Sequence, residues 1–156
     1  MLCACVGFGA CAEQQAVPDG CAPGAAPTLE IGRGEADFEA IADGRVELIH
    51  GIQGGYHTTM ALRAEALPAP DEAVEVELRG YLDGEELSRA VSYTRFLCDE
   101  DAQALEAWGL RLIWEATPED LAGQMVRIEA VVTSDDGSRA EAATEAVIHD
   151  PLLEDS

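Results

Sequence analysis

The sequence predicts an all-β fold, an immunoglobulin-like antiparallel β-sandwich of about seven strands. Three observations predict it. Apolar and polar residues alternate with a period of two along several stretches, turn-forming residues divide these stretches at spacings near ten residues, and at least one connection is long enough to cross between sheets. With 156 residues the chain has the length of one domain, which is enough for a hydrophobic core.

The first predicted strands are short. Residues 29–31 and 38–41 are expected as weak edge strands, and Asp43-Gly44 as the turn into a strand at residues 46–49. A longer strand is expected at residues 56–65, where alternation gives one face that is more apolar and therefore faces the core: Tyr56, Thr58, Met60, Leu62 and Ala64.

The clearest strand signal in the chain is at residues 74–82, where apolar residues and glycine alternate with charged residues and tyrosine. Pro68-Ala69-Pro70-Asp71 separates this strand from the one before it, because proline has no backbone N–H to donate to a hydrogen bond between strands. Asp83-Gly84 turns the chain into residues 85–97, where the alternation is less regular.

Residues 100–107 are rich in Ala, Glu and Leu and predict a helical turn. A period of two resumes after it and places Trp108, Leu110, Leu112 and Trp114 on one face, so both tryptophans are expected in the core. Residues 117–123 are expected as a crossing loop with one short helical turn that begins at Pro118. Two last strands, 126–132 and 140–148, flank a hairpin turn at residues 135–138.

The chain is strongly acidic, with 31 acidic residues against nine arginines, no lysine and a net charge of -22. A uniformly acidic surface repels phosphate backbones and anionic lipid surfaces, which argues against nucleic acid and against direct binding to such membranes. Acidity of this kind is typical of a well-solvated exported domain, or of one with a basic partner.

The first 11 residues are small or apolar and carry no charge, and Phe8-Gly9-Ala10-Cys11 resembles a bacterial lipobox. We expect residues 1–11 to be the remnant of a lipoprotein signal peptide with Cys11 as the lipid-attachment site, and the signal to extend further upstream, since no basic segment is present. The alternative is a buried N-terminal strand or helix. Residues 12–27 predict a flexible tether, residues 28–150 the β-sandwich domain, and residues 151–156 an acidic tail.

Cys21 and Cys98 would remain beside Cys11 in the mature chain, and an even pair in an exported protein favours a disulfide. Closing a loop of 77 residues would contribute roughly 4 kcal/mol on the chain-entropy account. The alternative is a nucleophilic Cys98, but the acidic residues that follow it raise a thiol pKa and disfavour the thiolate.

The glycine-rich corner, residues 50–57, joins two alternating stretches and holds two of the three histidines. Three glycines in five residues suit a tight corner where positive φ or a close backbone approach is needed. Three interpretations stay open for it. In the first, the side chains of Gln53 and His57 hydrogen-bond to loop backbone; in the second, the corner contacts a partner or small ligand; in the third, His50 and His57 bind a copper-type metal. The residues expected to form the binding site are Gln53, Gly54, Gly55, Tyr56 and His57.

One family resemblance is carried by two motifs, Gly34-x3-Phe38-x2-Ile41-x-Asp43-Gly44 and Gly51-x-Gln53-Gly54-Gly55-x-His57. Over residues 34–65 the chain resembles a group of uncharacterised bacterial envelope lipoproteins that carry a Gly-x-Gln-Gly-Gly-x-His motif in a β-sandwich domain. The resemblance implies export and a sandwich fold, and it implies no known reaction.

Motifs for catalysis are missing from the sequence: there is no phosphate-binding loop, no Gly-x-Ser-x-Gly elbow and no His-Glu-x-x-His pair. Asp135-Asp136-Gly137 lacks the other ligands of an EF-hand loop. We therefore expect no enzyme and no cofactor. The expected function is that of a non-catalytic interaction domain of the bacterial cell envelope, lipid-anchored on the periplasmic or surface face, with a protein or glycan partner; the alternative is a metal-binding protein.

Overall fold

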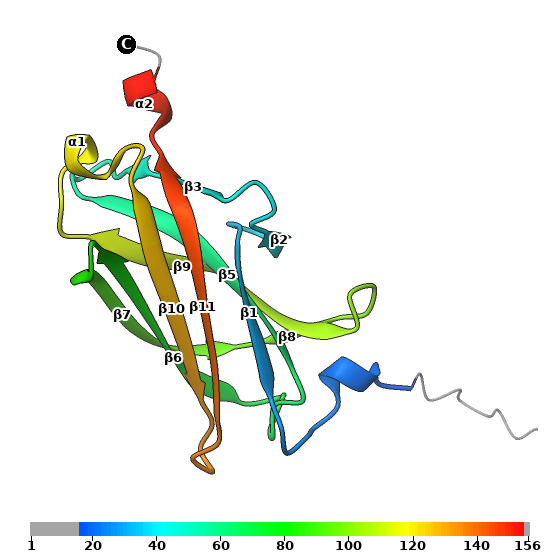
Figure 1. Cartoon of the computed structure of the whole chain (residues 1–156). Helices are drawn as coiled ribbons and strands as arrows, with labels where there is room; N and C mark the ends of the chain where they lie inside the picture. The colour runs from blue at the N-terminus through cyan, green and yellow to red at the C-terminus, as the bar shows by residue number, and fades with distance from the viewer. Residues whose placement is uncertain (1–15, 155–156) are drawn as a thin grey trace, which may run out of the picture.

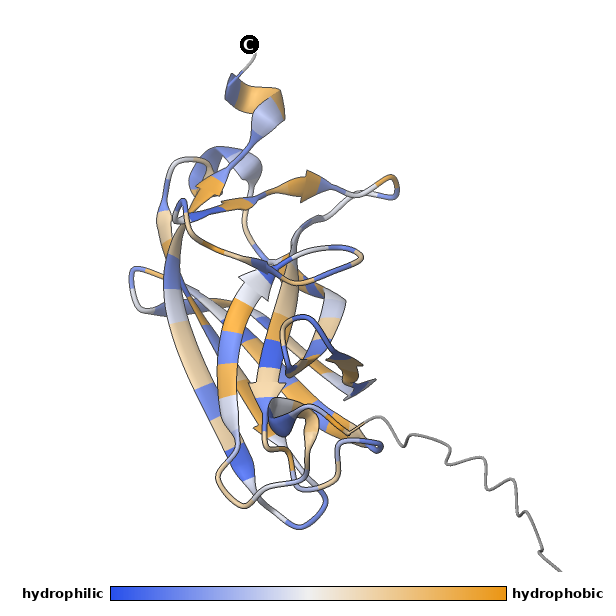
Figure 2. Ribbon diagram, turned by 90° about the vertical axis from the view of Figure 1, so that its right-hand side faces the viewer, coloured by the Kyte–Doolittle hydropathy of each residue, from blue (hydrophilic) through white to orange (hydrophobic). Residues whose placement is uncertain are grey.

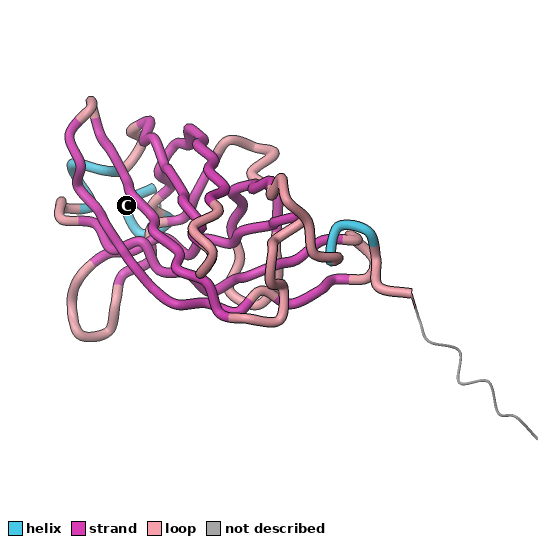
Figure 3. Tube along the Cα trace, turned by 90° about the horizontal axis from the view of Figure 1, so that it is seen from below, coloured by secondary structure: helices cyan, strands magenta, loops and turns pink. Residues whose placement is uncertain are grey.

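The computed structural model describes residues 16–154 and has the architecture of a β-sandwich, so the predicted all-β fold is confirmed (Figure 1). Seen from below (Figure 3), the strands make up the body of the molecule, and the N-terminal segment lies to one side. Cys11 and the predicted signal-peptide remnant, residues 1–11, lie outside the described residues.

The first sheet has the strand order β2-β1-β5-β9-β8, with β4 beside the start of β5, and all of its pairs are antiparallel. Its strands are β1 Thr28–Arg33, β2 Glu39–Ala40, β4 Ile49–His50, β5 Tyr56–Glu65, β8 Leu97–Asp99 and β9 Ala104–Trp114.

The second sheet has the order β3-β11-β10-β6-β7, in which only β3 and β11 run parallel. Its strands are β3 Arg45–Glu47, β6 Ala73–Leu82, β7 Glu85–Arg95, β10 Met125–Thr133 and β11 Arg139–His149. The helical turns are η1 Asp19–Cys21, α1 Pro118–Leu121 and α2 Pro151–Glu154. Within residues 16–154 no helix has the length and apolar character to cross a membrane.

The count of strands is larger than predicted. Seven strands have six residues or more, and four short ones of two or three residues, β2, β3, β4 and β8, extend the sheets at their margins. The predicted strand at residues 29–31 is not an edge, because β1 lies between β2 and β5.

The core lies between the two sheets and is built from the long strands. Apolar and polar residues alternate along these strands (Figure 2). In β6 and β10 every second side chain is buried, as the alternation predicts: Val74, Val76, Leu78, Val126, Ile128, Ala130 and Val132. The apolar face of β5 also faces the core, where Thr58, Met60 and Leu62 are fully buried.

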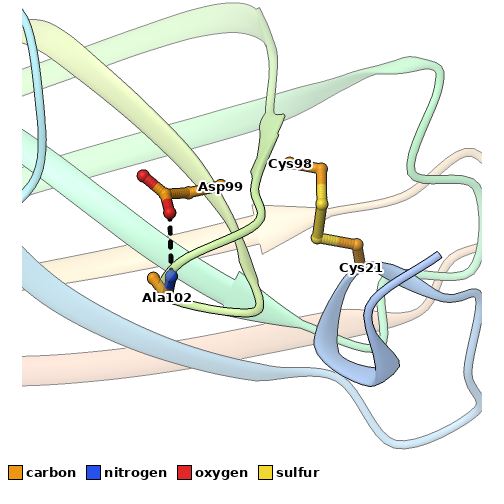
Figure 4. The surroundings of a disulfide bond; sticks show 4 residues. All are labelled: Cys21, Cys98, Asp99 and Ala102. Carbon is orange, nitrogen blue, oxygen red and sulfur yellow. Dashed lines mark hydrogen bonds between the residues drawn. A yellow bond between two sulfur atoms is a disulfide. The ribbon is translucent and has the colours of Figure 1, made fainter. Parts of the chain in front are cut away.

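The predicted helical turn at residues 100–107 is wrong. Residues 100–103 form a turn, which the Asp99 side chain stabilises by accepting a hydrogen bond of 2.8 Å from the Ala102 N–H (Figure 4). β9 begins at Ala104, and Leu105 pairs with both Cys98 of β8 and Ala64 of β5. Pairing with two strands outweighs the local helix propensity of this segment.

The prediction that both tryptophans share the core face is also wrong. A bulge interrupts β9, since Leu62 pairs with Ala107 but Met60 pairs with Leu110. Gly109 adopts φ +69° within this bulge, which lets the strand insert an extra residue. The bulge changes the register, so Trp114 belongs to the buried core while Trp108 is half-buried outside it.

The described part of the predicted tether, residues 16–27, is joined to the sandwich. η1 places Gly20 and Cys21 in buried positions, and the Ala66 N–H donates a hydrogen bond of 3.1 Å to the Gly20 carbonyl. The predicted disulfide is present between Cys21 and Cys98, with the two Cα atoms 5.7 Å apart (Figure 4). The packed part of the chain therefore begins before residue 28. A disulfide of this kind forms and persists in an oxidising compartment, which indicates export.

Candidate binding site at the glycine-rich corner

The glycine-rich corner forms a hairpin loop between β4 and β5. The Gly51 N–H donates to the Gly55 carbonyl and the Gly54 N–H to the Gly51 carbonyl, each at 3.0 Å. Gly54 and Gly55 adopt φ values of +87° and +86°, and a Cβ added at either position would meet no atom within 4 Å. These two glycines are therefore needed for their backbone conformation and not for a close approach.

The strand register determines which way the corner side chains point. Ile49 pairs with His57 and His50 pairs with Tyr56, and residues directly opposite in an antiparallel pair project to the same side. His50 therefore lies on the side of Tyr56, with the two rings in edge contact at 5.1 Å, and His57 projects to the other side. The two imidazoles do not converge on one point, as a shared metal ion would require.

Across residues 16–154, no three histidine, cysteine, aspartate or glutamate side chains are grouped so that they could hold a metal ion. This finding and the divergent imidazoles give the copper-type alternative no geometric support in the described part of the chain.

His50 has a partner that the sequence did not predict. Its Nε2 lies 2.9 Å from Oδ2 of Asp150, which is 1% exposed and whose Oδ1 accepts the Leu152 N–H at 3.0 Å. Burial works to raise the pKa of the Asp150 carboxyl, but the hydrogen bonds from His50 and the α2 backbone outweigh it, and the pKa lies below its usual value. This pair fixes the start of the corner to the end of β11.

A hollow of about 650 Å3 lies beside the corner, at the end of the first sheet where β4 and β5 meet β9. We call it the corner hollow. Cross-strand pairing brings β9 to it, since Ile113 pairs with His57 and Arg111 pairs with Thr59. Its lining comes from the β1–β2 connection, the corner itself and β9: Glu35, Ile49, His50, Gly51, Ile52, Gln53, Gly54, Gly55, Tyr56, His57, Arg111 and Ile113.

Apolar side chains are unusually accessible at the corner hollow. Ile52 at the tip of the loop is fully exposed, and Ile113 is 60% exposed. An exposed isoleucine on its own is common on protein surfaces, but two that border one concave site are typical of a contact surface.

The charge of the corner hollow differs from that of the rest of the protein. Six of the nine arginines pair with a carboxylate among residues 16–154, and Arg111 is among the three with no such partner in that range. Burial lowers the pKa of His57, the positive charge of Arg111 lowers it further, and Glu35 offsets part of the shift. At neutral pH the corner hollow therefore presents a guanidinium beside a neutral imidazole.

Neither Gln53 nor His57 makes a hydrogen bond with its side chain in the described part of the chain. The loop is closed by its own backbone, so the interpretation in which these two side chains satisfy loop backbone is not supported. Their amide and imidazole groups stay available to a ligand. Tyr56 differs, because its ring packs against the core from the inner side of β5.

Sequence reasoning found the corner but missed half of the site. Arg111 and Ile113 lie on the outward face of β9, where charged and apolar residues give no local signal of function. Only the pairing of β5 with β9, which joins residues more than fifty positions apart, brings them to His57.

No protein-family model and no curated protein matches this sequence. What the site supports is therefore argued from its geometry.

Proposed function

We propose that this protein is an exported bacterial lipoprotein, held at the cell envelope by a lipid on Cys11, and that its domain is a non-catalytic binding module. The corner hollow would contact a protein or glycan partner through Gln53, Gly54, Gly55 and His57, together with Arg111. The resemblance of residues 34–65 to envelope lipoproteins with the same Gly-x-Gln-Gly-Gly-x-His motif supports the location.

The observation that carries the proposal is the position of the corner hollow relative to the disulfide. β5 starts at Tyr56, in the corner, and runs ten residues to Glu65, after which Ala66 hydrogen-bonds to η1. Ten residues of strand span about 30 Å. The corner hollow and the disulfide-linked N-terminal segment thus lie at opposite ends of the domain, as a comparison of the two ends of β5 in Figure 1 shows.

This arrangement suits a tethered receptor. A lipid on Cys11 would hold the membrane at the η1 end of the domain, and the corner hollow would face away from the membrane toward a partner. The disulfide supports this role mechanically, because it links the segment that leads to the lipid directly to β8.

The chemistry of the corner hollow indicates what part of a partner would fit. The unpaired guanidinium of Arg111 suits an acidic or hydroxyl-bearing group, the neutral imidazole of His57 and the Gln53 amide add hydrogen bonds, and Ile52 and Ile113 add apolar contact. Both an acidic peptide loop and an acidic sugar carry such groups.

The binding role is tested by site-specific photo-crosslinking in the bacterium that produces the protein. A photoreactive amino acid at Ile52 is expected to give a discrete adduct, which disappears when Arg111 is also replaced by Ala. The matched control places the same amino acid at Asp136, an exposed position in the turn between β10 and β11 at the other end of the molecule. Equal adducts from both positions, or adducts that persist without the arginine, would refute a binding site at the corner.

The lipid anchor is tested separately. Exchange of Cys11 for Ala is expected to move the protein from the membrane fraction to the soluble fraction and to remove the lipid mass from its N-terminus. If the wild-type protein carries no lipid, the anchoring part of the proposal is wrong while the binding part stands or falls on the crosslinks.

A further inference from the structure

The second sheet ends in an open edge at β7. This strand pairs with β6 from Ala73–Arg95 to Leu82–Glu85, and no described strand lies on its other side. Only its beginning is covered, because the Leu87 carbonyl accepts the Glu115 N–H at 2.8 Å and the Ser88 hydroxyl donates to the Ile113 carbonyl. The outer backbone groups of residues 89–95 make no hydrogen bond to any described segment.

The open half of β7 has few of the features that usually protect a sheet edge. It contains no proline, no charged side chain that points into the sandwich, and no bulge, since the irregularity of the β6–β7 pair lies at Gly80/Tyr81. Its residues, Ala-Val-Ser-Tyr-Thr between two arginines, have high strand propensity. The edge is therefore regular enough to pair with another strand.

The open half of β7 differs in composition from the protein as a whole. Residues 89–95 contain two arginines and no acidic residue, in a chain that has 31 acidic residues, although the covered beginning of the strand carries Glu85 and Glu86. The outward row of the strand reads Arg89, Val91, Tyr93 and Arg95, and its two central side chains are 54% and 72% exposed. Thus two accessible apolar groups stand between two positive charges.

The opposite row of β7 is small and polar. Ala90 packs against the core, but the hydroxyls of Ser92 and Thr94 lie 3.2 Å apart at an accessible position. A strand added beside β7 would meet no bulky side chain on this face.

The charge pattern decides what kind of strand fits. Across an antiparallel or parallel pair, directly opposite side chains lie about 5 Å apart, so opposite charges stabilise the pair and like charges destabilise it. Arg95 makes no ion pair in the described chain, whereas Arg89 donates two hydrogen bonds, at 2.8 and 3.1 Å, to the exposed Glu86. Glu75 and Glu77 of β6 lie opposite Tyr93 and Val91, and the Tyr93 hydroxyl donates to Glu75 at 3.2 Å, but both carboxylates are one strand further from the open edge.

A second copy of this chain is a poor occupant. Antiparallel pairing of two β7 strands about Ser92 would place Arg89 of each copy opposite Arg95 of the other. It would also bring together two molecules that each carry a net charge of -22.

We propose that residues 89–95 of β7 accept an extended segment of a partner protein as an added strand. The segment would present an acidic, two apolar and an acidic side chain at alternate positions, opposite Arg89, Val91, Tyr93 and Arg95. Backbone hydrogen bonds along the edge would supply affinity, and the alternating side chains would supply specificity. This site is distinct from the corner hollow and does not rest on the function proposed for it.

A seven-residue synthetic peptide with blocked termini tests the proposal. It has Glu at its first and last positions, Val at its third and fifth, and Thr at the positions between these. When it is added to the isotope-labelled chain, saturable amide shifts are expected in residues 89–95. Replacement of Arg95 by Glu is expected to weaken binding about tenfold, since it puts like charges opposite each other. Replacement of Arg139 by Glu, an exposed arginine on β11, is the matched control and is expected to leave binding unchanged.

Two further measurements keep the test decisive. A peptide N-methylated at its five internal residues cannot donate backbone hydrogen bonds from those residues, and it is expected not to bind. The proposal would be overturned if the N-methylated peptide bound as tightly as the unmodified one. It would also be overturned if the unmodified peptide did not bind, or if the amide shifts lay outside residues 89–95. Sedimentation that shows a dimer of the chain alone, lost on replacement of Tyr93 by Glu, would assign the edge to self-association instead.

Discussion

The His50 imidazole lies 2.9 Å from the Asp150 carboxylate and so joins two residues that are a hundred positions apart in the chain. The contact links β4, which leads into the glycine-rich corner, to the residue that precedes α2. Asp150 is buried and also accepts a hydrogen bond from the α2 backbone. One carboxylate thus orders the C-terminal turn and one side of the candidate site.

Exchange of Asp150 for Asn is expected to lower the free energy of unfolding by about 2 kcal/mol, because it removes a charge-assisted hydrogen bond at a buried position. Urea denaturation measures the loss. Exchange of Glu154 for Gln is the control: this exposed residue pairs with His149 at 3.0 Å, and its loss is expected to cost less than about 0.5 kcal/mol.

The same pair predicts a pH dependence. The folded-state pKa of Asp150 lies below its unfolded value, so its stabilisation is present above about pH 4 and is lost as the pH falls through the folded-state pKa. The difference in unfolding free energy between the wild type and the Asn variant is therefore expected to narrow below about pH 4. A difference that stays constant down to pH 2 would contradict this.

Removal of the disulfide by exchange of Cys21 and Cys98 for Ser is expected to destabilise the domain by about 4 kcal/mol, because it frees a loop of 77 residues in the unfolded chain. Thermal unfolding with and without a reductant gives the measurement. The reductant is expected to destabilise the wild type and to leave the double variant unaffected; an effect on both would point to another reducible group.

Arg63 and Glu106 form an ion pair in which the carboxylate is removed from water and the guanidinium stays partly exposed. Arg63 donates two hydrogen bonds, at 2.9 and 2.7 Å, to one oxygen of Glu106, which is 4% exposed, and its guanidinium stacks on Phe38. Exchange of Arg63 for Ala is expected to cost about 3 kcal/mol, because it leaves a buried carboxylate unpaired. Exchange of Arg63 for Met together with Glu106 for Leu is expected to be less destabilising than the single variant. If chemical denaturation shows a larger loss of unfolding free energy for the double variant than for the single variant, the ion pair itself stabilises the fold.

Gly80 of β6 lies directly against the ring of Trp114, and a Cβ there would clash with the ring. Exchange for Ala is expected to cost about 2 kcal/mol through overpacking and to change the near-ultraviolet signal of the tryptophan. Exchange of Gly54 for Ala is the contrast. It introduces only the backbone strain of positive φ in open space, so about 1 kcal/mol is expected, with no change in that signal.

The electrostatics of the corner hollow can be measured on His57 by nuclear magnetic resonance. Its pKa is expected below the usual 6.5, because of burial and the charge of Arg111. Exchange of Arg111 for Gln is expected to raise that pKa, and exchange of Glu35 for Gln to lower it further. If neither exchange changes the pKa of His57, Arg111 and Glu35 do not act on the imidazole, and the recognition chemistry proposed for the corner hollow is wrong.

Much of the fold followed from local pattern. Alternation along residues 74–82 and 126–132 correctly assigned strands and their buried faces, since a period of two is a property of the strand itself. Turn chemistry was equally local: Asp83-Gly84 forms the predicted hairpin, and Thr117 caps α1 by accepting the Asp120 N–H. The disulfide was found by counting cysteines.

The errors lie where distant segments decide the outcome. Residues 104–107 have a composition typical of a helix, but they form a strand because they pair with β5 on one side and with β8 on the other. Trp108 lies outside the core because a bulge changes the register of β9, and this bulge depends on how β9 pairs with β5.

The sequence by itself determined the fold class, most of the inward faces and the glycine-rich corner, because each depends on the conformational preferences of neighbouring residues. Only the tertiary structure decided which side chains surround that corner. Arg111 and Ile113 reach it through the pairing of β9 with β5, and Asp150 through the end of β11. Partner choice between strands depends on burial and hydrogen bonding over the whole sandwich, which no local stretch of sequence encodes.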